Sequence, residues 1–313
     1  MIPSQQDVQQ AFERVVPHVH QTPVLTSRLL DELSGASIFF KCENFQKMGA
    51  FKMRGAINAI LQLPQADRAK GVVTHSSGNF AQAVSLAAKN LGIPAHIVMP
   101  NNAPQVKKDA VISYGGIIYE SEATIAARQT MASQIQDKTG ATFLHPSNDI
   151  DVILGQGTAA IELLQKHPSL QCIITPVGGG GLLAGSALAA KYFGSSVNVY
   201  GGEPLNADDA YRSFHSGEIQ YNSQVHTIAD GLRTHLGDKN FPIIKTLVTD
   251  IIRVEEKEII AAMKLLWERL KIIIEPSCAV PFAALLKDKK TFAGKKVGIV
   301  LSGGNVDLTS LPF

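Results

Sequence analysis

The chain has 313 residues, of which 45% are apolar and 18% are charged, and its formal net charge is +2. This length is sufficient for two lobes with cores of their own, and the near-neutral charge argues against a nucleic-acid partner. The chain has no apolar run of about 18 residues and begins with a polar segment, so we predict a cytoplasmic protein with no membrane partner.

Short apolar runs rich in β-branched residues alternate with longer amphipathic stretches along the chain. The apolar runs predict strands at 37–43, 71–76, 95–100, 115–121, 142–146, 172–178, 197–204 and 295–304. The amphipathic stretches predict helices at 79–92, 103–116, 123–140 and 158–167. This alternation predicts an α/β fold in which helices cover both faces of parallel sheet.

Three loops at the carboxyl ends of predicted strands are candidates for a ligand site, because ligands of parallel α/β sheets bind there. They are "HSSGN" at 75–79, "GGGGL" at 178–182 and "LSGGN" at 301–305. Four consecutive glycines between a strand and a helix let main-chain N–H groups converge on one point, which favours a phosphate group. The alternatives are a flexible turn and the dinucleotide turn of an oxidoreductase, although the spacing is not G-x-G-x-x-G.

Seven segments, spread in order over nearly the whole chain, carry a resemblance to a known family. They are "KCENFQKMGAFKMRGA", "HSSGNFAQA", "PVGGGGLLAG", "EPLNADD", "IADGL", "WERLKIIIEPS" and "LSGGNVDL". Together they resemble the serine racemase and serine/threonine dehydratase family of pyridoxal-phosphate (PLP) enzymes, fold type II. The resemblance implies two open, parallel-rich sheets, a large domain at 1–70 and 148–313, a small domain at 71–147, and PLP in the cleft between them.

The resemblance also implies which residues bind the cofactor. Lys52 would form a Schiff base with PLP, and Phe51 would pack beside it. Asn79 would bond to the cofactor's 3-oxygen, and Ser302 would face its pyridine nitrogen, where a hydroxyl favours elimination and racemisation over transamination. The residues implied for the cofactor phosphate are Gly178, Gly179, Gly180, Gly181 and Leu182.

In the mechanism that the resemblance implies, Lys52 removes the α-proton of the substrate and the β-hydroxyl then leaves. Burial in an apolar pocket would favour the neutral amine that this step needs, whereas a surface lysine would stay charged. Ser77 resembles the acid that protonates the opposite face in racemases, although it could equally cap a helix. Ser76, Asn79 and Arg128 resemble the residues that bind the substrate carboxylate.

The segment "EPLNADD" resembles the divalent-cation site of this family. By that resemblance Glu203 and Asp209 supply carboxylates and Ala207 supplies a main-chain carbonyl to Mg²⁺, Ca²⁺ or Mn²⁺, with water completing the oxygen shell. The alternative is a solvated acidic loop. A homodimer is implied by the family alone.

The leading hypothesis is therefore a PLP-dependent ammonia-lyase with serine racemase activity. It would convert L-serine, L-threonine or a relative such as 3-hydroxyaspartate to a 2-oxo acid and ammonia. Phe80 and Met48 depart from the His and Thr usual in the family's racemases, which leaves the substrate preference open. The alternatives are β-replacement of the cysteine-synthase type, a nucleotide-binding oxidoreductase and a non-catalytic PLP carrier.

Overall fold

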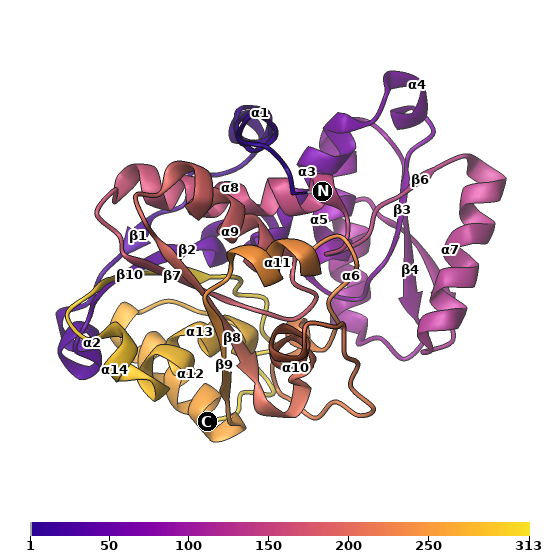
Figure 1. Ribbon diagram of the computed structural model, residues 1–313. Helices are drawn as coiled ribbons and strands as arrows, with labels where there is room; N and C mark the ends of the chain where they lie inside the picture. The colour runs from indigo at the N-terminus through magenta and orange to yellow at the C-terminus, as the bar shows by residue number, and fades with distance from the viewer. Residues whose placement is uncertain (1) are drawn as a thin grey trace.

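The computed structural model describes residues 2–313 and contains two open sheets, which Figure 1 shows side by side. The larger sheet has the strand order β1-β2-β10-β7-β8-β9, with β1 antiparallel to β2 and the other neighbours parallel. The smaller sheet, β5-β4-β3-β6, is parallel throughout. The strands are β1 (Val24–Leu25), β2 (Ser37–Cys42), β3 (Val72–His75), β4 (Ala95–Pro100), β5 (Ile117–Ser121), β6 (Thr142–Phe143), β7 (Cys172–Pro176), β8 (Asn198–Pro204), β9 (Asp250–Val254) and β10 (Lys296–Leu301).

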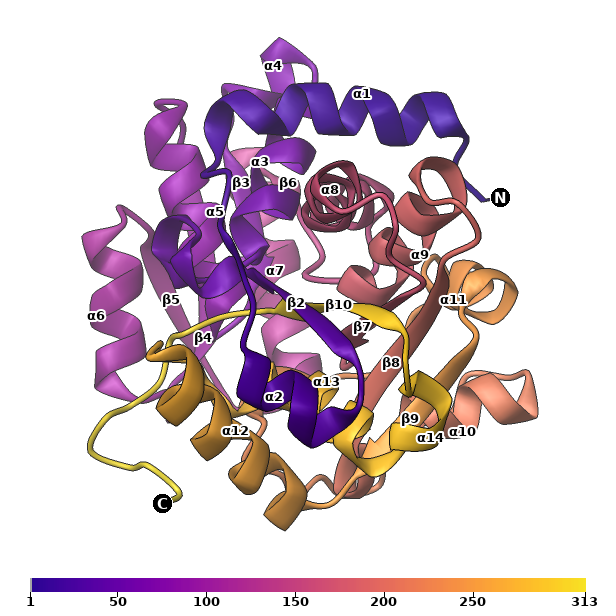
Figure 2. The same ribbon diagram turned by 90° about the vertical axis from the view of Figure 1, so that its left-hand side faces the viewer.

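Helices cover both faces of the larger sheet. The helices are α1 (Gln5–Val15), α2 (Arg28–Ser34), α3 (Lys52–Gln62), α4 (Gln65–Arg68), α5 (Asn79–Asn90), α6 (Gln105–Ser113), α7 (Ile125–Thr139), α8 (Ile150–Lys166), α9 (Gly181–Phe193), α10 (Asp209–Ser216), α11 (Phe241–Leu247), α12 (Glu256–Leu270), α13 (Pro276–Lys287) and α14 (Lys289–Phe292). Figure 2 shows α8 and α9 on one side of this sheet and α12 and α13 on the other. Neighbouring residues of β7 point to opposite faces, so Ile173 packs in the core with α8 and α9, whereas Ile174 packs in the core with α12 and α13.

The predicted fold class is confirmed, and each of the eight predicted strands is present. Two strands were missed, β1 because it is only two residues long and β9 because its sequence is half polar. The four strands of the smaller sheet lie between residues 72 and 143. The domain limits themselves stay a prediction. Within residues 2–313, no helix is long and apolar enough to cross a lipid bilayer.

The helix predicted to begin at 158 begins at Ile150, because two glycines that disfavour a helix in isolation serve close helix packing here. A Cβ atom on Gly155 would lie 2.5 Å from the carbonyl oxygen of Arg54 in α3. A Cβ atom on Gly157 would lie 2.5 Å from the carbonyl oxygen of Gly185 in α9. The glycines therefore let α3, α8 and α9 approach one another closely at the centre of the molecule.

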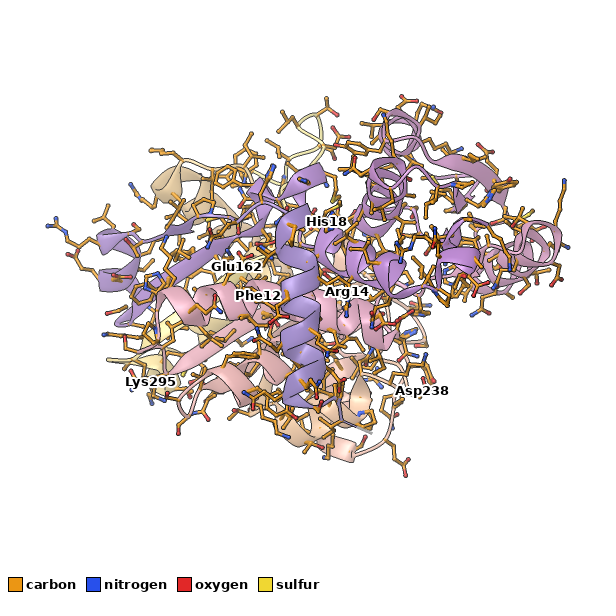
Figure 3. All side chains as sticks on the ribbon, turned by 90° about the horizontal axis from the view of Figure 1, so that it is seen from above. Phe12, Arg14, His18, Glu162, Asp238 and Lys295 are labelled. Carbon is orange, nitrogen blue, oxygen red and sulfur yellow. The ribbon has the colours of Figure 1, made fainter. Side chains whose placement is uncertain are left out.

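Helix α1 lies over the joint between two cores. Its N-terminus is fixed by a capping box in which Ser4 and Asp7 bond to each other's main chain. Figure 3 shows α1 crossing above α8, with Phe12 and Arg14 labelled along it. Arg14 donates a hydrogen bond of 2.6 Å from Nη1 to Oδ1 of Asn58, which ties α1 to α3.

Candidate active site

The first turn of α3 is held against the end of β10 by a short antiparallel pairing. The main-chain N–H of Phe51 donates to the carbonyl of Ser302 at 3.0 Å, and the N–H of Gly304 donates to the carbonyl of Gly49 at 2.9 Å. The bridge between Ala50 and Gly303 lies between these two bonds. This pairing brings the loop "LSGGN" beside the start of α3, so two predicted site segments separated by about 250 positions meet in space.

Lys52 is the first residue of α3 and lies in apolar surroundings. Its Nζ is 5.0 Å from the ring centroid of Phe51 and 5.5 Å from that of Phe80, and it donates a 2.8 Å hydrogen bond to the carbonyl of Pro146. Burial lowers the pKa of the Lys52 ammonium to about 8, although the negative charge of Glu275 opposes the shift. An amine that loses its proton near neutral pH can act as a nucleophile or a general base.

The loop between β3 and α5 carries the predicted residues Ser76, Ser77 and Asn79. Ser76 lies at the strand end, where its N–H donates to the carbonyl of Val98 at 3.1 Å and its hydroxyl accepts from the N–H of Gly78 at 3.4 Å. Ser77 lies at the bend that follows, and Asn79 begins the helix. The loop therefore presents two hydroxyls and an amide at the carboxyl edge of the smaller sheet, as the sequence predicts.

Glu275 is a buried carboxylate of this site that the sequence analysis did not assign. Both of its oxygens accept from Nδ2 of Asn79 at 3.0 Å, and its main-chain N–H donates to the carbonyl of Gly303 at 3.0 Å. The carbonyl oxygen of Asn79 is in turn 2.8 Å from Nδ2 of Asn305. Burial raises the pKa of the Glu275 carboxyl to about 7. The available signal was an acidic residue at a helix start between an isoleucine run and a proline.

The raised pKa of Glu275 predicts a pH-dependent stability. Between the pKa of about 4.3 for an unfolded glutamate and the folded value of about 7, the folded chain binds the extra proton. The free energy of unfolding should therefore fall as pH rises through this window, by up to about 3 kcal/mol. Glu275→Gln should remove that fall, so urea titrations at pH 5 and pH 8 should show the variant gaining on the wild type at pH 8. An equal difference between the two proteins at both pH values would contradict the prediction.

The tetraglycine turn lies between β7 and α9, as predicted, and all four glycines are buried. Gly180 adopts a left-handed conformation with a φ of 79°, and α9 begins at the next residue without a side-chain cap. A Cβ atom on Gly179 would lie 2.3 Å from Oγ of Ser147, and one on Gly178 would lie 2.7 Å from Cα of Leu232. Side chains are thus excluded, and the main chain with the uncapped helix N-terminus forms a turn suited to an anion.

Three further residues complete the surroundings of Lys52. Leu182 packs with Phe51 and Val300 in a small buried cluster, and Ser302 follows β10 with 2% of its surface exposed. Arg128 lies on the first turn of α7, where its Nε is 3.4 Å from the carbonyl of Thr124. Its positive charge helps to lower the pKa of His75 at the end of β3, after the larger effect of burial. Arg128 therefore faces the edge of the sheet where Ser76 and Ser77 lie.

A second group of predicted residues lies at the end of β8. Glu203 accepts from the N–H groups of Ala210 and Tyr211 at 2.9 Å and 2.8 Å. Asp209 accepts from Nδ2 of Asn222 at 2.7 Å through Oδ1, whereas its buried Oδ2 has no partner in residues 2–313. Burial raises the pKa of Glu203, to which the charge of Asp209 adds, and raises the pKa of Asp209 to about 7.

These two carboxylates fit a divalent cation, because both are buried and an unpartnered oxygen faces no protein donor. Ala207, which is also buried, lies in the 3₁₀ turn η4 (Leu205–Ala207) between them. Within residues 2–313 no set of three or more His, Cys, Asp or Glu side chains is arranged for a metal. A cation here would therefore need main-chain carbonyl and water oxygens as well.

The family model for pyridoxal-phosphate-dependent enzymes matches residues 15–303 of the chain. The chain belongs to this PLP-dependent enzyme family. The match accounts for the tetraglycine turn without a dinucleotide, so the oxidoreductase alternative is not retained.

Relatives and solved structures within the PLP-dependent family cover nearly the whole chain. A protein of Paracoccus denitrificans named beta-hydroxyaspartate dehydratase is 48% identical, over 100% of this chain and 99% of that protein. The crystal structure of serine racemase from Dictyostelium discoideum is 48% identical, covers 98% of this chain and 100% of that one, and superposes with a TM-score of 0.94. The structure of maize serine racemase is 47% identical at a TM-score of 0.96, covering 99% of this chain and 95% of that one. A crystal structure of a bacterial-type threonine deaminase, from T.th., is 42% identical at a TM-score of 0.93, covering 98% and 100% of the two chains.

The residues present fit PLP. The buried tetraglycine turn with the uncapped start of α9 suits the cofactor phosphate, and Lys52 has the amine with a lowered pKa that PLP requires. Asn79 differs from a free ligand amide, because Glu275 and Asn305 already orient it. The individual roles of these residues, and of Ser302, stay predictions.

Proposed function

We propose that this PLP-dependent enzyme eliminates the β-hydroxyl of L-serine, L-threonine or 3-hydroxyaspartate, giving a 2-oxo acid and ammonia, and that it also racemises serine. The observation that carries the proposal is Lys52, an amine with a pKa of about 8 in an apolar pocket beside the tetraglycine turn. The relatives named beta-hydroxyaspartate dehydratase and serine racemase support the two halves of the proposal.

When bound, PLP would act as the electron sink for the charge left on the substrate's α-carbon. Lys52 removes the α-proton, because its amine is neutral in a large fraction of molecules near its pKa of about 8. The carbonyl of Pro146 orients that amine, and the rings of Phe51 and Phe80 keep water from it. Ser76, Asn79 and Arg128 hold the substrate carboxylate, which fixes the α-proton toward Lys52.

Racemisation needs a proton donor on the face opposite Lys52, and we assign it to Ser77. Ser77→Ala should lower the rate of serine racemisation by at least about 10²-fold, while the elimination of L-serine changes by less than about threefold. Chiral chromatography of residual serine, together with 2-oxo acid release, measures both rates. Ser223→Ala, in an exposed loop, is the control. Equal losses of both activities, or unchanged racemisation, would show that Ser77 is not the donor.

We also propose that Glu203, Asp209 and the carbonyl of Ala207 bind Mg²⁺ or another divalent cation, because the cation would neutralise two buried carboxylates. Mg²⁺ at about 100 times its Kd should stabilise the wild type by about 2.7 kcal/mol. Asp209→Asn should remove the rise in Tm that Mg²⁺ causes after treatment with a chelator, whereas Glu218→Gln, at an exposed position, should retain it. The same rise in both variants would place the cation elsewhere.

The assay that tests the function uses one panel of substrates. L-serine, L-threonine and the isomers of 3-hydroxyaspartate are incubated with the purified protein, and release of 2-oxo acid and ammonia is measured with and without sulfide. Keto acid and ammonia from at least one of them are expected. A product that forms only with sulfide would support β-replacement instead, and cofactor absorbance without turnover would support a PLP carrier. A cytoplasmic homodimer completes the proposal, which sedimentation and fractionation would test.

A further inference from the structure

We propose that His145 is a positioning residue whose imidazole holds the 145–148 turn and so presents the Pro146 carbonyl to Lys52. The inference deepens the proposed function, on which it rests, because it concerns the amine assigned to proton transfer. Nothing in the sequence analysis singled out His145, which follows a short predicted strand. Its role emerges from hydrogen bonds that join this turn to both Lys52 and the tetraglycine turn.

The 145–148 turn is anchored on the side of the smaller sheet. The N–H of Leu144 donates to the carbonyl of Val73 at 2.8 Å, and Oγ1 of Thr74 donates to the carbonyl of Leu144, also at 2.8 Å. After the turn, Asp149 caps α8 by accepting from the N–H groups of the first turn of that helix. The turn is therefore the short segment that carries the chain from β3 and β6 to α8.

The imidazole of His145 closes this turn through one nitrogen. Its Nδ1 lies 3.2 Å from the N–H nitrogen of Ser147 and 2.8 Å from that of Asn148. Because both groups donate, Nδ1 must be the unprotonated acceptor and the ring must be the neutral tautomer with its hydrogen on Nε2. Burial lowers the pKa of His145 to about 4, and the positive charges of His75 and Lys52 act in the same direction. The ring is thus neutral at pH 7.

The turn that His145 closes contacts both parts of the cofactor site. The Pro146 carbonyl accepts from Nζ of Lys52 at 2.8 Å. The Ser147 carbonyl accepts at 3.0 Å from Nδ2 of Asn240, and the same Nδ2 donates to the Gly179 carbonyl at 2.9 Å. A shift of this turn would therefore displace the acceptor of Lys52 and a support of the tetraglycine turn together.

The outer side of the turn is held at the surface. Asn148 donates through Nδ2 to Oδ1 of Asp238 at 2.7 Å, and its own Oδ1 accepts from the N–H of Lys239 at 2.8 Å. Asp238, labelled in Figure 3, is exposed. The turn thus keeps anchors on both sides when the imidazole is removed, so loss of His145 should loosen it without detaching it.

The consequence for chemistry is geometric. Without an acceptor at Nδ1, two partly buried N–H groups lose their hydrogen bonds, and the Pro146 carbonyl no longer has a fixed direction. Proton transfer depends steeply on the placement of the amine, whereas substrate binding uses other residues. We expect kcat to fall and KM to change little.

Three substitutions separate the two ring nitrogens. In His145→Asn, the side-chain oxygen is as many bonds from Cα as Nδ1 and can accept from both N–H groups. In His145→Gln, the amide lies farther out, near the position of Nε2. In His145→Leu, a side chain of similar size has no acceptor. His226→Leu, at an exposed position, is the matched control.

The first readout is hydrogen exchange of the Ser147 and Asn148 amides, followed by mass spectrometry of peptides that cover the turn, and the second is kcat and KM. In His145→Leu and His145→Gln the two amides should exchange at least about tenfold faster and kcat should fall at least about tenfold, with KM within about twofold. His145→Asn and His226→Leu should match the wild type in both readouts.

Retained activity in His145→Gln with loss in His145→Asn would assign the role to Nε2 and overturn the proposal, as would unchanged exchange in all three variants. If His145→Leu does not fold, the Asn and Gln pair decides alone. Hydrogen exchange does not need turnover, so absence of eliminase activity in the wild type would contradict the proposed function while the exchange data still test the role of His145.

Discussion

Replacing Lys52 with alanine is expected to lower kcat for β-elimination by at least about 10³-fold, because the substitution removes both the lysine that holds PLP and the general base. The change leaves a small apolar side chain among the rings of Phe51 and Phe80, so the fold should persist. Release of 2-oxo acid from L-serine measures the activity, and circular dichroism verifies the fold.

Lys257→Ala is the control for this experiment, because Lys257 lies on the surface and its Nζ contacts only the exposed carboxylate of Glu255. It should retain the activity of the wild type. More than about a tenth of the wild-type activity in Lys52→Ala would contradict the assignment of Lys52 as the base. Loss of activity in both variants would point to a general effect of removing lysines.

The second large effect is expected for stability. Arg54→Ala should lower the free energy of unfolding by about 3 to 5 kcal/mol, because Arg54 is fully buried and neutralises two buried carboxylates. Its Nε lies 2.7 Å from Oε2 of Glu43, and its Nη1 lies 2.7 Å from Oε1 of Glu162. Glu162, labelled in Figure 3, is also paired with Lys41, but Glu43 would keep only neutral donors. Urea or thermal unfolding measures the loss.

Arg28→Ala is the matched control, because the Arg28–Glu32 pair is 3.4 Å apart and its side chains are 88% and 63% exposed. Its removal should change the stability by less than about 1 kcal/mol. Similar losses in the two variants would show that burial of the Arg54 network does not matter. The network also bears on the site, because Arg54 lies two residues after Lys52 on α3 and fixes that helix to β2 and α8.

The sequence predicts those parts of the site whose signal is local. Gly178 to Gly181 lie together in the chain, and the strand before them and the helix after them can be recognised from apolar periodicity. The loops containing Ser77 and Ser302 follow strands in the same manner. All three loops are where the sequence analysis expects them, at the carboxyl ends of β3, β7 and β10.

The missed residues depend on partners that lie far away in the chain. Glu275 matters because it holds Asn79, which is 196 positions away. His145 matters because the turn it closes faces Lys52, 94 positions from Pro146. Arg54 and Glu162 are 108 positions apart, and as charged residues they would be placed on the surface by composition alone. Such roles require the tertiary structure.

The central claim is that Lys52 is the lysine that holds PLP, and one measurement tests it directly. Borohydride reduction of the purified protein fixes bound PLP to its lysine, and mass spectrometry of the digested protein identifies the modified peptide. We predict that the pyridoxyl mass appears on the peptide that contains Lys52. No modification, or modification of another lysine such as the buried Lys41, would contradict the claim.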